Sequence, residues 1–441
     1  MKFQRRRCMA ILATTCITLS NSVFAQQNSF DLSKVNTITT AVPFLRINND
    51  TRSGGMGEVG IAIEPDAGGA QLNGAKMAFI DHDFGVNLSF TPWLKSLVDD
   101  IYLANLSGYY RIKNVQTVHA TFRYFSLGNI QFKDDNNQDI GQSRPQELAV
   151  DLGYSRKLGK IFSLGLTLRF IYSALAPGAP AVGNGSGVIK PGIAGAADIS
   201  WMVNKTFDDK KNSKMKHQLM AGMNISNLGS KITYTNNVTK DYIPANLGLG
   251  LGYSLHLDEK HTVSAYVDVN RLLVPTPVKS SELYEINPIT NQKEIKKQYD
   301  TNNNGVADYR EQSTMSGVFK SFGGAPIAEK MNENQVGVGV EYFYKKMFGV
   351  RGGYFYEHPT KGNRQFASVG ATVKYSIVAL HLSYLIPVTS QRNPLDNTFR
   401  FTLNFEFNKG GKKKDAQSTP TEPIQKELKP RQMQIQENNA N

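Results

Sequence analysis

One stretch of the chain carries oxygen-bearing side chains at the spacing of a calcium-binding loop. Residues 300–311 read DTNNNGVADYRE. A twelve-residue loop of this kind wraps one Ca²⁺ with oxygens from positions 1, 3, 5, 7, 9 and 12, and position 7 uses its backbone carbonyl. Gly305 stands at position 6, where the chain must turn sharply. The predicted ligands are Asp300, Asn302, Asn304, Val306, Asp308 and Glu311.

The same residues also fit a flexible loop. Asp300, Asp308 and Glu311 are the only carboxylates among the predicted ligands, and the sequence shows no evident flanking helices. Asparagine-rich strings also occur in disordered segments. As a calcium site, the loop would be weak, filled at millimolar extracellular calcium and ordered by the ion. No other cofactor is predicted.

The sequence shows no catalytic constellation. Its seven histidines include no HExxH motif and no pair at the spacing of metal ligands. His119, His256 and His381 have no assignable nucleophile or carboxylate partner, which a hydrolase would need. The string GNGSG at 183–187 lacks the Lys-Ser/Thr ending of a phosphate-binding loop. We therefore predict that the protein is not an enzyme.

The first 25 residues are typical of a secretory signal peptide. Basic residues precede an apolar run from Cys8 to Leu19, and cleavage is expected after Ala25. Both cysteines of the chain, Cys8 and Cys16, lie in this segment. Lipidation at Cys16 is not expected, because the residues before it form a poor lipobox. The mature chain therefore has no thiol for disulfides or catalysis.

Beyond this segment, apolar and polar residues alternate. Between residues 162 and 170, Phe and Leu alternate with Ser, Gly, Thr and Arg, and residues 247–257 and 399–407 repeat the pattern. A period of two is typical of β-strands with one apolar face. No later stretch approaches the roughly 20 apolar residues that a membrane-spanning helix needs. A soluble β-sandwich shows the same alternation, so the period alone leaves both folds open.

Strand lengths and connections favour a transmembrane β-barrel. The candidate strands are about 8 to 15 residues long, which suits a tilted crossing of a bilayer. They begin near residues 83, 100, 115, 146, 161, 189, 216, 245, 261, 334, 347, 365, 378 and 397. Their number is even, and tight turns alternate with long connections, as in bacterial outer-membrane barrels. The predicted fold class is therefore an all-β, 14-stranded antiparallel transmembrane barrel.

The prediction divides the chain into four parts. Residues 1–25 are the signal peptide, and residues 26–80 form a plug. Residues 81–407 form the barrel, with a long extracellular loop at 273–333. Residues 408–441 form a disordered, basic periplasmic tail. The predicted location is the outer membrane, with both termini periplasmic because the strand number is even.

The polar faces of the strands carry charges of both signs. In a barrel these side chains line the lumen, where we expect a lattice of ion pairs rather than an ion path, because unpaired buried charge is costly. The residues are His119, Arg123, Glu147, Asp151, Arg169, Asp268, Glu341, Arg351, Glu357, Lys374, Arg400 and Glu406. The formal net charge is +13, but no aromatic residues interleave with the lysines of the tail. Nucleic acid is therefore not a predicted partner.

Several motifs resemble known families of outer-membrane barrels. SGGMGEVGIAIEPDAGGAQLNGAK from Ser53 resembles the N-terminal hatch of the fourteen-stranded FadL family. Longer runs resemble the PorV (LptO) family of the type IX secretion system: TPWLKSLVDDIYLANLSGYY from Thr91, RYFSLGNIQF from Arg123, NISNLGSKITY from Asn224 and GYFYEHPTKGNRQF from Gly353. This resemblance covers roughly residues 41–407, without the loop near 279–313 and the tail.

The resemblance implies a non-enzymatic role in type IX protein secretion. PorV-like proteins dock against the large translocon barrel, bind the C-terminal signal domain of secreted cargo and pass the cargo to a sortase-like attachment complex. Outer-membrane lipid is the remaining expected partner. The alternative is a FadL-like channel for hydrophobic small molecules, and a barrel hydrolase is a third hypothesis.

A carrier of folded domains needs apolar anchors on its outer loops. The predicted anchors are Trp93 and Leu94 in the first outer loop, Phe132 in the second, and Phe319, Phe322 and Pro326 in the loop between the ninth and tenth strands. Trp93 equally fits an aromatic belt at the membrane interface.

Overall fold

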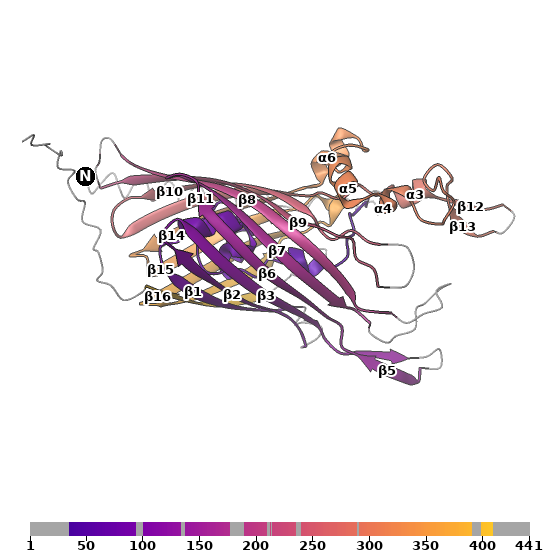
Figure 1. Cartoon of the computed structure of the whole chain (residues 1–441), viewed down its shortest axis with the longest axis horizontal. Coiled ribbons are helices and arrows are strands. Elements are labelled where there is room, and N and C mark those ends of the chain that lie inside the picture. Colours follow the sequence, from indigo (N-terminus) through magenta and orange to yellow (C-terminus); the bar gives the residue numbers. More distant parts are fainter. Residues whose placement is uncertain are drawn as a thin grey trace, which may run out of the picture. The chain divides into compact units, whose positions relative to one another are not determined.

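The described chain forms a closed antiparallel barrel of fourteen strands (Figure 1). The computed structural model describes residues 35–93, 100–133, 137–176, 189–209, 212, 214–234, 240–288, 291–389 and 398–408. The barrel strands are β1 (Phe84–Pro92), β2 (Ile101–Ile112), β3 (Gln116–Leu127), β6 (Gln146–Lys157), β7 (Phe162–Ala174), β8 (Gly192–Asp208), β9 (Lys216–Gly229), β10 (Asn246–His256), β11 (His261–Leu272), β14 (Asn334–Tyr344), β15 (Phe348–Tyr356), β16 (Gln365–Tyr375), β17 (Val378–Pro387) and β18 (Phe399–Phe407).

The predicted fold class is confirmed. Each strand begins within three residues of its predicted start. The barrel closes where β1 pairs with β18, in a register that places Phe84 opposite Phe407. Closure satisfies the backbone groups of both terminal strands, so the sheet has no open edge.

The apolar faces of the strands point away from the lumen. Leu164, Leu249 and Phe401 keep 43%, 46% and 41% of their surface exposed, whereas the neighbouring Arg400 is fully buried. The period-two alternation therefore separates an apolar outer wall from a polar lumen, as in a barrel surrounded by lipid. No helix in the described residues is long and apolar enough to span a membrane.

Residues 35–80 lie inside the barrel (Figure 1, indigo). They include the short helices η3 (Pro43–Arg46), α2 (Thr51–Gly54), η4 (Gly69–Gln71) and η5 (Gly74–Phe79). The backbone N–H groups of Gly60 and Ile61 donate to the Asp268 carboxylate of the wall, at 2.6 and 2.9 Å. Gly57 has a φ of +66°, and a Cβ there would lie 2.4 Å from the carbonyl oxygen of Tyr354. Glycine is therefore required at this close approach of the plug to the wall.

Many charged side chains of the lumen form ion pairs, as predicted, whereas Glu147 and Asp268 accept hydrogen bonds from the Ser173 hydroxyl and from the plug backbone. Asp151 accepts from Arg123 at 3.0 Å and from Arg169 at 2.7 Å, and Arg169 also pairs with Asp198 at 2.9 Å. A second group joins plug to wall, because Glu341 pairs with Arg351 of the wall at 3.1 Å and with Arg52 of the plug at 2.6 Å. These buried charges are paired, which offsets their desolvation.

The two ends of the barrel differ in their connections. The end that carries β1's first residue has six short connections. Tight turns join β2 to β3, β6 to β7, β10 to β11, β14 to β15 and β16 to β17, and residues 209–215, which are described only in part, join β8 to β9. The other end carries the long loops, including residues 273–333 with α3 (Ser280–Leu283), β12 (Tyr284–Ile286), β13 (Lys293–Ile295), α4 (Asp308–Glu311), α5 (Thr314–Lys320) and α6 (Ile327–Asn332). A hairpin of β4 (Ile130–Lys133) and β5 (Asp139–Ser143) lies between β3 and β6.

The plug segment crosses from one end to the other. Asn36 donates its backbone N–H to Thr360 in the long-loop connection of β15 and β16, at 2.9 Å. Asp83 donates its N–H to Phe407 at the tight-turn end, at 3.0 Å. The prediction that both termini are periplasmic concerns residues 1–34 and 409–441, which lie outside the described residues.

Candidate functional site

Two short helices of the long loop carry their apolar residues on the exposed side. In and after α5, Met315, Phe319 and Phe322 follow a spacing of four and three residues, and they are 56%, 72% and 54% exposed. In α6, Ile327 and Met331 are four residues apart and 81% and 69% exposed. Residues at these spacings share one helix face, which in a globular protein normally packs on the core. We call this surface, together with the exposed Pro326, the outer apolar face.

The opposite side of α5 rests on an aromatic ring. Gly317 is buried, and a Cβ there would lie 2.9 Å from the ring of Tyr242. The Tyr242 hydroxyl donates to the carbonyl oxygen of Gln312 at 2.8 Å. Ser313 caps the helix by accepting from the backbone N–H of Ser316 at 3.3 Å. The small Gly317 thus seats α5 on Tyr242 and leaves the apolar residues outside.

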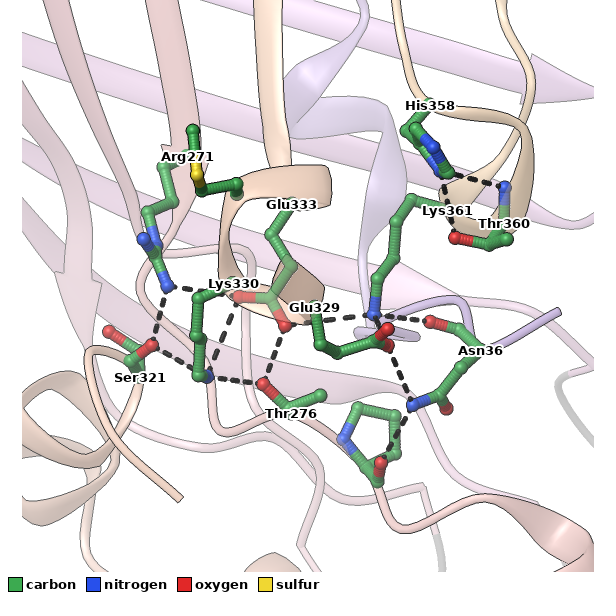
Figure 2. A network of polar contacts seen from close by, with 12 residues as sticks. Asn36, Arg271, Thr276, Ser321, Glu329, Lys330, Glu333, His358, Thr360 and Lys361 are labelled. Carbon is green, nitrogen blue, oxygen red and sulfur yellow. Dashed lines mark hydrogen bonds and ion pairs between the residues drawn. The ribbon is translucent and has the colours of Figure 1, made fainter. Parts of the chain in front are cut away.

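A network centred on Glu333 holds α6 (Figure 2). The side chain of Glu333 is almost fully buried and pairs with Arg271 at 3.0 Å, Lys330 at 3.5 Å and Lys361 at 3.6 Å. The hydroxyl of Thr276 donates to the same carboxylate at 2.6 Å. Burial lowers the pKa of the Lys330 ammonium, against the opposing charge of Glu333. One carboxylate thus joins β11, both ends of the long loop and the β15–β16 connection.

A second carboxylate of α6 reaches the start of the plug. Lys361, in η6 (Pro359–Lys361), pairs with Glu329 at 2.5 Å and donates to the carbonyl oxygen of Asn36 at 2.9 Å. The Asn36 amide donates to Glu329 at 3.3 Å and to the carbonyl oxygen of Pro277 at 3.0 Å. Burial opposes ionisation of Glu329, but the hydrogen bond and charge of Lys361 outweigh it and lower the pKa of this carboxyl. The plug and the outer apolar face are therefore anchored at the same point.

The predicted calcium ligands lie in a folded turn. Asp300 is 5% exposed and accepts from the backbone N–H of Asn304 and of Gly305, at 3.0 and 2.8 Å. Gly305 has a φ of +77°, as a sharp turn at this position requires. Glu311 accepts from the Asn302 amide at 2.7 Å. Among the described residues, no three His, Cys, Asp or Glu side chains are grouped to hold a metal ion. Calcium binding therefore stays a prediction.

The other predicted ligands take part in the same turn or lie beside it. Asp308 accepts from the backbone N–H of Thr301 at 3.1 Å. Asn304 also approaches Glu311 through its side-chain amide, at 2.5 Å, and accepts from the N–H of Val306 at 2.9 Å. The side-chain oxygens are thus engaged by N–H donors of the loop itself.

The remaining predicted anchors do not join the outer apolar face. Trp93 follows β1, is partly buried and packs edge-on against Phe125, with 5.6 Å between ring centroids. The ring packs against the buried cluster that includes Val42 and Phe44 of the plug, so it faces the lumen and does not belong to an outward aromatic belt. Leu94 lies outside the described residues, and the side chain of Phe132, in β4, is also outside them.

Half of the outer apolar face was not predicted from the sequence. Met315, Ile327 and Met331 join the predicted Phe319, Phe322 and Pro326. The spacing of four residues was a detectable signal of short helices. The direction that these helices face was not, because it depends on Tyr242 and Glu333.

A comparison with protein families identifies the chain. The sequence pattern of one family, described as "Type IX secretion system protein PorV", matches residues 30–279, which is more than half of the chain. The chain belongs to the PorV family. It is therefore an outer-membrane β-barrel and a component of type IX secretion. The predicted family and the predicted outer-membrane location are confirmed, whereas the periplasmic position of the termini stays a prediction.

Solved structures of other barrels are distantly similar. A TodX deltaS2S3 mutant monoaromatic hydrocarbon channel has a TM-score of 0.43 and 11% identity, over 80% of this chain and 96% of that one. The toluene transporter TbuX of Ralstonia pickettii has a TM-score of 0.39 and 12% identity, over 81% and 97%. A FadL homologue of Pseudomonas aeruginosa has a TM-score of 0.40 and 10% identity, over 85% and 100%. No curated protein sequence is similar enough to count as a match.

Proposed function

We propose that this PorV-family barrel binds the C-terminal signal domain of secreted cargo at the large translocon barrel and transfers the cargo to the sortase-like attachment complex. The observation that supports this role best is the outer apolar face, where Phe319 and Ile327 are 72% and 81% exposed. Large apolar residues so exposed on two consecutive helices of one loop are typical of a binding surface. Covering one such side chain gains roughly 1.5–3 kcal/mol.

The base of this surface favours protein binding. Glu333, Glu329 and Lys361 hold α6 in place before any partner arrives. A surface ordered in advance loses less entropy on binding, so more of the apolar contact energy is available for affinity. Aromatic and methionine anchors surrounded by polar residues are typical of the centre of an interface.

The orientation belongs to the same proposal. Outer-membrane barrels place short turns in the periplasm and long loops at the cell surface. With that orientation, the outer apolar face meets partners outside the cell, and the chain after Phe407 starts in the periplasm. The role that we propose is binding and transfer, without catalysis.

The alternative, a FadL-like channel for hydrophobic small molecules, receives less support. A cavity of about 110 Å³ lies beside the plug, and its lining includes Glu58, Arg123 and Asp268. Pockets for small molecules are usually 300–1,000 Å³ and mostly apolar. A larger cavity of about 380 Å³, near Tyr242 and the start of the plug, also has charged residues, Lys240 and Arg310, in its lining.

A site-specific photocrosslinker tests the proposal. Placed at Phe319 in cells, it is expected to capture secreted cargo or the attachment complex. The matched control is Ile286, which is 60% exposed in β12 of the same loop but outside the outer apolar face. Equal capture from both positions would contradict a specific surface.

A variant with Phe319→Ser and Ile327→Ser extends the test to function. We expect loss of surface attachment for many secreted proteins at a normal level of barrel in the membrane. Normal attachment together with impaired uptake of hydrophobic compounds would instead favour the channel.

A further inference from the structure

Lysines stand at the tips of the tight turns. Five of the six short connections at this end carry an exposed lysine among the described residues. These residues, which we call the lysine ring, are Lys113, Lys160, Lys214, Lys260, Lys345 and Lys346. Two of these connections also carry acidic residues, because Asp258 and Glu259 accompany Lys260, and Asp209 accompanies Lys214.

Three of these lysines occupy backbone conformations that disfavour them. The φ angles of Lys113, Lys345 and Lys346 are +50°, +52° and +54°. Turns whose central residues have these angles usually contain Asn and Gly, because a Cβ is strained against the backbone carbonyl there. A residue that occupies a backbone conformation disfavoured for its type indicates that its side chain has a function.

The lysine ring lies next to a belt of exposed aromatic residues. Tyr110 is 41% exposed and three residues before Lys113, and Phe348 is 51% exposed and two residues after Lys346. Tyr154, Phe207 and Tyr253 hold similar places on other strands, with 40%, 40% and 38% of their surface exposed. Such belts lie at the headgroup level of a membrane. The ammonium groups just beyond the belt therefore reach the phosphate layer.

We propose that the lysine ring binds the phosphate groups of anionic glycerophospholipids in the leaflet around the tight-turn end. The lysines are distributed over turns from β2 to β15, around most of the closed sheet. A protein partner would contact one sector of this circumference, whereas a leaflet surrounds all of it. Each lysine near an anionic surface is expected to raise the local preference for anionic lipid by about five-fold at low salt. This inference does not depend on the cargo-binding role.

The chain contains its own reporter for the experiment. It has two tryptophans, and Trp201 in β8 is paired with the exposed Leu164, so its ring lies on the lipid side. The substitution Trp93→Phe leaves Trp201 as the single tryptophan of the chain. The full chain is reconstituted in nanodiscs with brominated phosphatidylglycerol or brominated phosphatidylcholine, and quenching of Trp201 fluorescence gives the relative occupancy of the two lipids.

The expected result is a several-fold preference for phosphatidylglycerol at low salt, which falls at high salt because the charges are screened. Replacing Lys160, just before β7, and Lys214, just after β8, with Gln should remove most of this preference. The matched control replaces Lys297 and Lys320, exposed in the long loop, and should keep it.

Equal quenching by both lipids in the protein with an unmodified lysine ring would overturn the proposal. An acidic protein would then be the remaining candidate partner of the ring. A preference that survives Lys160→Gln and Lys214→Gln would overturn it as well. Both readouts are made without cargo or translocon, so neither outcome bears on the cargo-binding role.

Discussion

The long-loop end and the tight-turn end of this barrel present different chemistry on the same fourteen strands. At the long-loop end, helices α5 and α6 hold apolar residues outward on a base of buried ion pairs. At the tight-turn end, the turns hold lysines beyond an aromatic belt, and the turns themselves contain no helices among the described residues. An apolar face on a fixed base suits one specific partner, whereas dispersed charge suits a surrounding surface.

The largest effect is expected from Glu333→Ala. The change leaves Arg271, Lys330 and Lys361 without their shared carboxylate, and breaking a buried ion pair costs roughly 3–5 kcal/mol. Hydrogen exchange should increase in α6 and at Asn36, while the strands of the tight-turn end keep their protection. Uniformly faster exchange over the whole barrel would show that the two ends are not independent.

A smaller effect is expected from Phe319→Ser combined with Ile327→Ser. Both side chains are exposed, so the free energy of unfolding should change by no more than about 0.5 kcal/mol for each. Affinity for a protein partner should fall by about 2 kcal/mol or more, because anchors of this type dominate interfaces. Surface plasmon resonance with purified cargo signal domain measures the affinity, and denaturant unfolding measures the stability. Unchanged affinity would remove the outer apolar face from the interface.

Acidification should loosen the anchor between plug and long loop. The pKa of Glu329 is lower in the folded protein than the usual value of about 4.3. A carboxyl with a lowered pKa stabilises the fold at pH values above its unfolded pKa, and this contribution is lost as the pH falls through the folded pKa. Exchange at Asn36 should therefore rise below about pH 4. Glu329→Gln should show fast exchange already at neutral pH, and an unaltered pH profile in that variant would contradict the assignment.

The smallest effect is expected from calcium. Millimolar Ca²⁺ should protect residues 300–311 from proteolysis, because a loop with few carboxylates binds the ion weakly. Asp300→Asn should abolish the protection, and the barrel should melt at the same temperature with and without the ion. Equal cleavage of the unmodified loop in calcium and in a chelator would rule out the site.

The local alternation of residues was enough to predict the strands. From Phe162 to Phe170 each side chain's face follows from its parity, and a period of two depends only on neighbours in the chain. The same parity placed Asp151 and Arg169 in the lumen, where they form an ion pair. Charges on one face of a closed sheet must share the enclosed space. The presence of ion pairs in the lumen was therefore predictable.

The tertiary structure alone decided which residues meet at the long-loop end. Arg271, Glu333 and Lys361 are separated by tens of residues, and no periodicity relates them. The packing of Trp93 on the plug was not predictable from the sequence either, because it depends on how residues 35–44 enter the lumen. A helix with apolar residues at a spacing of four is expected to bury them; in α5 and α6 the packing of the polar side turned them outward. Patterns local to the chain determined the barrel, and contacts between distant segments determined the surface with which it binds.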